Sequence, residues 1–388
     1  MPQKSRLLTP GPTPLPDRVR LAMARDMIHH RKPEFIKLFG DIQKNLQILF
    51  GTNGPVISLT ASGSGAMTAA IANLFTAGES VITVEGGKFG ERWTKICASM
   101  GVKPLPLSVP WGESVQVERI ERLLDTTPGI AGICVQVSET STGVMHPVKE
   151  LAALAQKRGI LLIADGISAV SISPCPMDAW GIDCLLTGSQ KGLMLPPGLS
   201  FIALSSRAWK KTESLPCHNF YFDLAAERDS SASCQTNFTP PISLLFGLAE
   251  SLSLMLEEGL DAIYQKQWAM TRMARAGVDA LGFPFLAKTD FTWGLTSLML
   301  PFGVSASPLL AHAAEKYGVV MAAGMGHMKE SCIRIGHMGW VDAADIAFGL
   351  YALASSFKAM GGHIGSSDYL ERAFTAYEAA LLEPLPIQ

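Results

Sequence analysis

Several features of other protein classes are missing from this chain of 388 residues. It has no basic excess, because 34 acidic residues face 32 lysines and arginines, which gives a formal net charge of −2. Binding to nucleic acid or to an acidic membrane surface is therefore not expected. No run of 18 uncharged apolar residues occurs, and the apolar stretch near Ile242–Leu260 is interrupted by Glu250, Glu257 and Glu258. The pattern excludes a membrane-spanning helix.

Paired cysteines are also missing. The seven cysteines are an odd number at wide spacing, and no Cys-x-x-Cys pair occurs. They are Cys97, Cys134, Cys175, Cys184, Cys217, Cys234 and Cys332. A disulfide framework or a structural zinc site is therefore not expected, and no other metal-binding cluster stands out. Because the N-terminus also lacks the apolar segment of a secretion signal, we expect a cytoplasmic protein with free thiols.

The composition is that of a folded protein. Hydrophobic residues make up 48% and charged residues 17%, which rules out a disordered chain, and the length suits two or three domains. Strands are expected at Val56–Leu59, Ser80–Val84, Gly132–Val137, Ile160–Ala164, Cys184–Leu186 and Ser200–Leu204. Helices are expected at Gly65–Leu74, Glu91–Met100, Val117–Leu124, Pro147–Arg158 and Ile242–Glu258. This alternation predicts a doubly wound α/β domain with a mostly parallel sheet, whose ligands bind at the carboxyl ends of the strands.

The two ends of the chain differ from this middle part. Prolines within Thr9–Pro16 predict an extended arm over residues 1–20 and exclude a helix there. The apolar spacing from about Arg18 to Phe50 predicts one amphipathic helix. After about residue 260, a long helix pattern followed by shorter runs predicts a smaller α+β region. The expected division is therefore an arm (1–20), a large domain (21–260) and a small domain (261–388).

Three segments that follow predicted strands carry polar groups suited to one cofactor. Ser62-Gly63-Ser64-Gly65-Ala66 opens a helix, where free N–H groups can bind a phosphate. Asp165 directly follows Ile160–Ala164, and Lys191 lies in a glycine-flanked turn after the next strand. Each has an ordinary alternative, namely a tight turn, an N-cap and a solvent-facing lysine. Together, in this order, they indicate pyridoxal phosphate, with Asp165 at the ring nitrogen and Lys191 at the aldehyde.

From Pro10-Gly11-Pro12-Thr13 to the segment around Arg334, the chain resembles the class V aminotransferases of fold type I, in the alanine–glyoxylate and serine–pyruvate group. The most specific match is Gly188-Ser189-Gln190-Lys191, followed by Pro196-Pro197-Gly198. The resemblance implies the fold already expected, a large doubly wound domain with a smaller C-terminal α+β domain. It also implies pyridoxal 5'-phosphate and a transaminase. The enzyme would move an amino group from a small amino acid (alanine or serine) to a 2-oxo acid (glyoxylate or pyruvate) through a Schiff base on Lys191.

The resemblance also gives single residues a role. The cofactor contacts it implies are Ser64, Gly65, Ala66 and Gln190 at the phosphate, Phe89 and Ile167 on the two ring faces, Thr140 near the ring hydroxyl, Asp165 at the pyridinium and Lys191 at the aldehyde. For the substrate carboxylate it implies Thr140 as a hydrogen-bonding residue and Arg334 as a clamp, because a guanidinium can bind a carboxylate through two hydrogen bonds. Phe89 has the alternative of a core aromatic, and Arg334 that of a surface ion pair.

A shared active site is implied as well. Asn237–Pro241 resembles a segment that reaches the phosphate of the neighbouring subunit, with Thr239 as the best match, which implies a homodimer. His30 is expected near the dimer interface in a structural role. His327 and Lys329 are expected at the substrate entrance, either reading a second acidic group or lying in a solvated loop.

Two alternatives use the same fold. The first is a pyridoxal-phosphate lyase or desulfurase. A desulfurase needs a cysteine on a mobile loop, and Cys332 lies in a predicted strand, two residues before Arg334. A non-catalytic member is expected to lack the lysine or the aspartate, and both are present. Some relatives carry His where Ala66 stands and Trp where Phe89 stands, so the substrate is left open.

Overall fold

The computed structural model describes residues 4–215 and 219–386, and Cys217 lies outside them. The six described cysteines are free thiols. None of the described helices is both long and apolar enough to cross a membrane.

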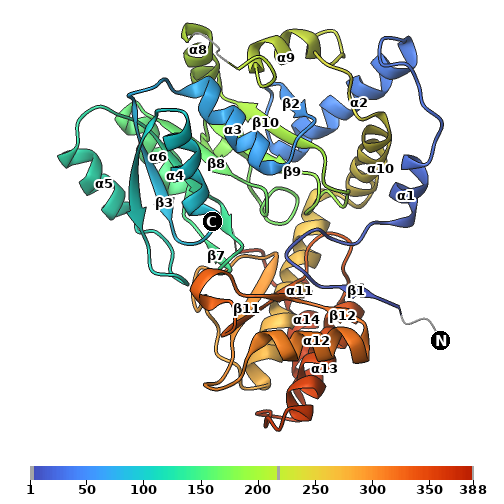
Figure 1. Cartoon of the computed structure of the whole chain (residues 1–388). Helices are drawn as coiled ribbons and strands as arrows, with labels where there is room; N and C mark the ends of the chain where they lie inside the picture. The colour runs from blue at the N-terminus through green and yellow to red at the C-terminus, as the bar shows by residue number, and fades with distance from the viewer. Residues whose placement is uncertain (1–3, 216–218, 387–388) are drawn as a thin grey trace.

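A seven-stranded sheet organises the first two thirds of the chain (Figure 1). Its strands, in spatial order, are β2 (Val56–Leu59), β10 (Ser200–Leu204), β9 (Cys184–Gly188), β8 (Leu161–Asp165), β5 (Ile130–Gln136), β3 (Ser80–Glu85) and β4 (Lys103–Ser108). The pairings from β9 to β4 are parallel, and β10 runs antiparallel to both of its neighbours. The central strands are buried along their whole length, as their continuous apolar sequences predict.

Helices cover both faces of this sheet. One face packs against α3 (Gly63–Leu74), α4 (Gly90–Ser99), α8 (Ser206–Ser214) and α9 (Leu224–Ser231). The other packs against α2 (Pro33–Phe50), α5 (Val117–Thr126), α6 (Val148–Arg158), α7 (Met177–Trp180) and α10 (Ile242–Glu258). A short hairpin, β6 (Ser138–Glu139) with β7 (Val144–Met145), follows β5. This is the doubly wound architecture expected from the sequence.

The C-terminal part forms its own antiparallel sheet, in the order β11 (Leu295–Met299), β14 (Cys332–Gly336) and β13 (Ala322–Ala323). Around it lie α11 (Leu260–Ala280), α12 (Ala306–Tyr317), the 3-10 turn η1 (Gly326–Met328), α13 (Ala343–Ala359) and α14 (Tyr369–Leu382). In Figure 1 these orange and red elements lie below the central sheet. The domain limits at residues 20 and 260 stay a prediction.

Two expectations for the N-terminal region are wrong. The arm is extended only up to Pro16, because α1 (Asp17–Met23) occupies the last positions of the expected segment 1–20. The stretch from Arg18 to Phe50 is two helices, since the chain leaves the helical conformation after α1 and α2 begins at Pro33. Proline is favoured at a first helical position, and it keeps the residue before it extended, as Lys32 is here.

The arm connects the two parts of the molecule. Its strand β1 (Arg6–Leu7) pairs in parallel with β12 (Val319–Val320) of the C-terminal part, and α1 packs on α10. Between them, the segment from Leu8 to Pro16 runs past the carboxyl ends of the central strands, where the Lys191 side chain meets Pro10.

Candidate active site

Lys191 follows β9 and is buried, with 8% of its surface exposed. Its Nζ donates a hydrogen bond to the carbonyl oxygen of Pro10. Gly11, which follows Pro10, has φ +94, and a Cβ added to Gly11 would lie 2.5 to 2.6 Å from the end of the Lys191 side chain. Burial, helped by the Arg334 charge, lowers the pKa of Lys191 to about 8. A larger share of this amine is therefore neutral and nucleophilic than in a solvated lysine.

Asp165 is the last residue of β8 and is also buried. Its Oδ1 accepts a hydrogen bond of 2.8 Å from the Ile167 N–H, and no described residue donates to Oδ2. Burial raises the pKa of Asp165 to about 7, and the nearby Glu139 carboxylate adds to this effect. A buried carboxylate with one open oxygen is suited to a cationic partner.

The start of α3 offers an anion site beside these residues. The N–H groups of Gly65 and Ala66 donate to the Ser62 carbonyl, whereas no described group accepts from those of Gly63 and Ser64. The Ser64 hydroxyl accepts a hydrogen bond of 2.8 Å from Arg92, which adds a cation to the helix N-terminus. Unpaired N–H groups, the helix dipole and a guanidinium together favour a phosphate.

Ile167 and Gln190 lie against this helix start. A Cβ added at Gly63 would collide with the Ile167 side chain, and a Cβ added at Gly188 would lie 2.9 Å from Gln190 Oε1. That oxygen is buried without a hydrogen-bond partner. The Ala66 side chain points elsewhere, into the apolar cluster beneath α3.

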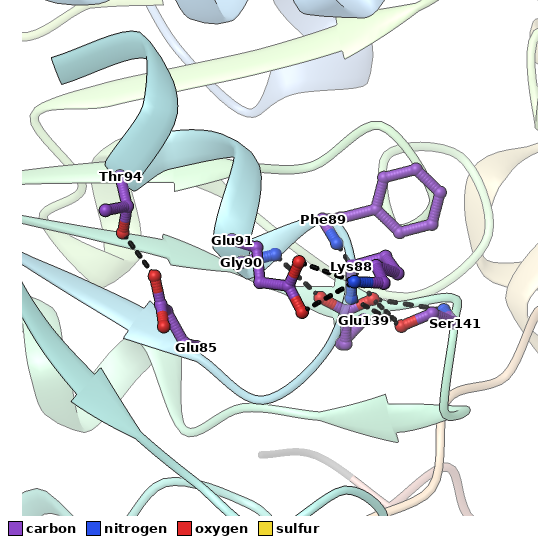
Figure 2. A network of polar contacts seen from close by, with 8 residues as sticks. All are labelled: Glu85, Lys88, Phe89, Gly90, Glu91, Thr94, Glu139 and Ser141. Atoms are coloured by element: carbon purple, nitrogen blue, oxygen red, sulfur yellow. Dashed lines mark hydrogen bonds and ion pairs between the residues drawn. The ribbon is translucent and has the colours of Figure 1, made fainter. Parts of the chain in front are cut away.

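Phe89 lies at the turn that begins α4, half-buried, and Figure 2 shows the polar contacts that surround this turn. The Arg92 guanidinium lies 4.9 Å from the centre of the Phe89 ring. Beneath the turn, the Glu139 carboxylate accepts hydrogen bonds from the N–H groups of Phe89 and Gly90.

Arg334 projects from β14. Its Nε donates to the Ala323 carbonyl and its Nη1 to the Thr140 carbonyl, each at 2.9 Å. No carboxylate of a described residue lies within 4.0 Å, so the surface ion pair considered as an alternative is not formed. Burial lowers the pKa of Arg334, although the group stays a cation. A half-buried guanidinium, held by carbonyls and lacking an anionic partner, can accept a carboxylate.

Four other predicted residues lie apart from these groups, of which Thr239, His327 and Lys329 are exposed and His30 is half-buried. Thr239 is exposed, in the loop between α9 and α10, and makes no hydrogen bond to another described residue. His30 is stacked on His29, with ring centres 5.0 Å apart. His327 is exposed and its ring lies 4.4 Å from that of Trp111, while Lys329 is exposed nearby.

The sequence reasoning missed Arg92, Glu139 and the Pro10–Gly11 turn. Arg92 stands three residues after Phe89, a spacing that places both side chains on one side of a helix. Glu139 is a charged residue two positions after the predicted apolar strand Gly132–Val137, a signal similar to the one that identified Asp165. Pro10 and Gly11 gave no comparable signal, because their contact with Lys191 spans 181 positions of the chain.

These residues fit pyridoxal phosphate. The lowered pKa of the Lys191 amine suits reaction with the aldehyde, and the open oxygen of Asp165 suits the ring nitrogen. The start of α3 with Arg92 suits the phosphate. The amide groups of Gln136 and Gln190, buried at this edge of the sheet, leave three polar atoms without a hydrogen-bond partner, which is typical of a site for a polar ligand.

Comparisons with known proteins point the same way. The family described as aminotransferase class V matches residues 16–346. A serine–glyoxylate aminotransferase from Methylorubrum extorquens is 32% identical over 351 residues, which cover 87% of each chain. An alanine–glyoxylate aminotransferase structure from Nostoc superposes with a TM-score of 0.87 at 28% identity, over 92% of this chain and 96% of that one. A Synechococcus protein, 35% identical over 98% of this chain and 99% of its own, carries the name soluble hydrogenase, small subunit. That name does not agree with the match of this chain to the aminotransferase family.

Proposed function

The chain belongs to the class V aminotransferases, which depend on pyridoxal phosphate, and we propose that it transfers the amino group of alanine or serine to glyoxylate or pyruvate. The observation that carries the proposal is that Lys191, a buried amine with a lowered pKa, and Asp165, a buried carboxylate, lie close together at the carboxyl ends of adjacent strands. The choice of small substrates is supported by the names of the Methylorubrum and Nostoc relatives.

Bound pyridoxal phosphate supplies an electron-withdrawing ring that stabilises negative charge on the α-carbon of the amino acid. Lys191 would hold its aldehyde carbon, Asp165 its ring nitrogen, and Gly63, Ser64 and Arg92 its phosphate. In its ionised form, Asp165 would keep the ring nitrogen protonated. Because the site is buried, this charge pair would be shielded from water, which strengthens it.

Lys191 has two tasks in this account. Its Nζ would hold the cofactor aldehyde carbon while no substrate is bound, and when free it would accept the proton of the substrate α-carbon and donate it again. An amine with a pKa of about 8 can accept and release that proton near neutral pH. The Pro10 carbonyl gives the released Nζ a hydrogen-bond acceptor close to the site.

Arg334 would fix the carboxylate of each substrate in turn. The two carbonyls that hold the guanidinium come from Ala323 in β13 and from Thr140 in the turn between β6 and β7. They orient the remaining N–H groups before a substrate arrives, which lowers the cost of binding.

A desulfurase is disfavoured by the position of Cys332. It lies within β14, fully buried, and burial raises the pKa of its thiol to about 12. A nucleophilic thiol needs a lowered pKa and access to the substrate. A non-catalytic family member is disfavoured because Lys191 and Asp165 are both present and follow adjacent strands.

A homodimer with a shared site is part of the proposal. Beside Thr239, the aromatic rings of Phe220, Tyr221 and Phe238 pack on one another, although Phe220 is 85% exposed. An exposed aromatic group of this kind suits a protein interface. Mixing Lys191→Ala with Thr239→Ala subunits tests it. A shared site should regain activity in the hybrid, because one of its two sites is then intact, whereas a site within one subunit should not.

The proposed reaction is tested by its two halves. The holoenzyme is given single amino acids without an acceptor, the visible absorbance of the cofactor is followed, and the released 2-oxo acid is identified by mass. Alanine or serine should bleach the band and yield its 2-oxo acid, and glyoxylate or pyruvate should restore the band. If every amino acid leaves the absorbance unchanged, or if a different product forms, the proposal is wrong.

A further inference from the structure

Glu139 is a buried carboxylate that has no role in the reaction described so far. It lies at the end of β6 with none of its surface exposed. Its Oε1 accepts hydrogen bonds from the Ser141 hydroxyl at 2.6 Å, the Ser141 N–H at 3.0 Å and the Phe89 N–H at 3.4 Å, and its Oε2 from the Gly90 N–H at 2.9 Å (Figure 2). Two segments about 50 positions apart in the chain therefore meet at one side chain.

A second contact closes the same junction. The Ser141 hydroxyl, which donates to Glu139, accepts a hydrogen bond of 2.9 Å from the Lys88 N–H. The backbone at Gly87 passes so closely that an added Cβ would lie 2.5 Å from the carboxyl carbon of Glu139. Residues 87–90 are thus fixed to residues 139–141 by hydrogen bonds and by close packing.

The surroundings of Glu139 are suited to an ionised carboxylate. All four hydrogen bonds are donated to it, three of them by backbone N–H groups, and α4 begins at Gly90 with its positive dipole end facing the carboxylate. Burial raises the pKa of Glu139, and the four donors oppose that effect. A buried charge of this kind is kept only where its hydrogen bonds are made, so the carboxylate holds the turn firmly.

Each of the two fixed segments carries a group of the proposed site. Phe89 is the residue that the family resemblance implies on one face of the cofactor ring, and Thr140 supplies the carbonyl that holds Arg334 Nη1 at 2.9 Å. Glu139 lies between them and, in this account, touches neither cofactor nor substrate. We propose that Glu139 is a positioning residue that sets Phe89 against the cofactor ring and keeps Thr140 in place behind Arg334. This inference rests on the proposed function.

Glu139→Gln tests the proposal, because the variant keeps the shape of the side chain and replaces one acceptor oxygen by an NH₂ donor that faces N–H groups. Glu85→Gln is the matched control. Glu85 precedes the same turn, where its Oε1 accepts a hydrogen bond of 2.5 Å from Thr94, and no side-chain hydrogen bond between described residues joins this pair to the Glu139 group (Figure 2). Both variants are compared for cofactor affinity, for the visible circular dichroism of the bound cofactor, which reports the geometry around the ring, and for melting temperature without cofactor.

In Glu139→Gln we expect cofactor affinity to fall roughly tenfold or more, since hydrogen bonds to a charged group are lost, and the circular dichroism to weaken. KM for the amino donor should also rise, because Thr140 no longer steadies Arg334. Glu85→Gln should retain all these properties. In a Phe89→Ala background the added effect of Glu139→Gln on cofactor affinity should largely vanish, because the ring it positions is gone.

The proposal is overturned if Glu139→Gln binds the cofactor with unchanged affinity and dichroism, or if its effect adds fully to that of Phe89→Ala. If Glu139→Gln lowers the melting temperature but leaves cofactor affinity and circular dichroism unchanged, the Glu139 carboxylate has a purely structural role. If Glu139→Gln does not fold, Ser141→Ala serves instead, since it removes one donor to Glu139 and the acceptor of Lys88. If Phe89→Ala itself leaves cofactor binding unchanged, the ring-face role that the family resemblance implies for Phe89 fails, and that result is distinct from a failure of the Glu139 inference.

Discussion

The Lys191 amine donates a hydrogen bond to the Pro10 carbonyl, so the N-terminal arm forms one wall of the candidate active site. A second bond, from the Thr13 hydroxyl to the Lys191 carbonyl at 3.0 Å, holds the same two segments together. The Leu8 carbonyl in turn accepts from the Gly336 N–H at 2.7 Å, two residues beyond Arg334. The arm therefore links the proposed cofactor lysine to the proposed substrate clamp.

Gly11→Ala tests the fit of this wall. The new methyl group would lie 2.5 to 2.6 Å from the Lys191 chain, so either the lysine or the arm must move. Overpacking of this kind costs about 1–3 kcal/mol, so we expect cofactor affinity and turnover to fall by roughly 5- to 150-fold. Gly78→Ala is the matched control, because Gly78 has φ +92 and nothing within 4 Å of the added methyl group. Equal losses in the two variants would mean that backbone strain, and not contact with Lys191, is responsible.

The lowered pKa of Lys191 predicts how cofactor capture depends on pH. The pKa of Lys191 is about 8, so at lower pH the amine is mostly protonated and cannot attack the aldehyde. The capture rate of the cofactor-free protein should therefore rise about tenfold per pH unit up to pH 7 and level off above 8, whereas a solvated lysine would keep rising to about pH 10. Stopped-flow absorbance measures this profile, with Nα-acetyl-lysine, whose side-chain amine is free, as the reference. Arg334→Gln should shift the midpoint upward, because a nearby cation is removed. A rate still rising steeply at pH 9 contradicts the buried amine.

Arg334→Gln should mainly weaken substrate binding. Loss of a hydrogen-bonded charge partner costs about 1.5–3 kcal/mol, so KM for both the amino acid and the 2-oxo acid should rise roughly 10- to 150-fold, with a smaller change in kcat. Steady-state kinetics with both substrates check this. A simple amine without a carboxylate serves as the control donor and should react equally slowly with both proteins. Unchanged KM values would show that the carboxylate binds elsewhere.

Cys332→Ala separates transamination from sulfur chemistry. Because the thiol is buried in β14, the variant should keep transaminase activity within about twofold, at the modest stability cost of a small cavity. Activity is measured together with sulfide release from cysteine. A loss of turnover with an unchanged melting temperature would favour the desulfurase reading.

The sequence was sufficient for those features that depend on local pattern. Asp165 and Lys191 lie at strand ends, as predicted, because apolar runs such as Ile160–Ala164 identify buried strands and the residue after each run must reach the edge of the sheet. The break between α1 and α2 was missed because apolar spacing outweighed Pro33 in the interpretation. The contacts of Gly11 and Glu139 join segments far apart in the chain, which no local pattern encodes.

The central claim is that Lys191 is the residue that holds the cofactor, and chemical reduction tests it most directly. The holoenzyme is treated with borohydride, digested, and its peptides are identified by mass. The account predicts a pyridoxyl group on the peptide that contains Lys191, and no such group in Lys191→Ala treated in the same way. A pyridoxyl group on another lysine, or none on any peptide of a protein that retains its visible band, would contradict the account.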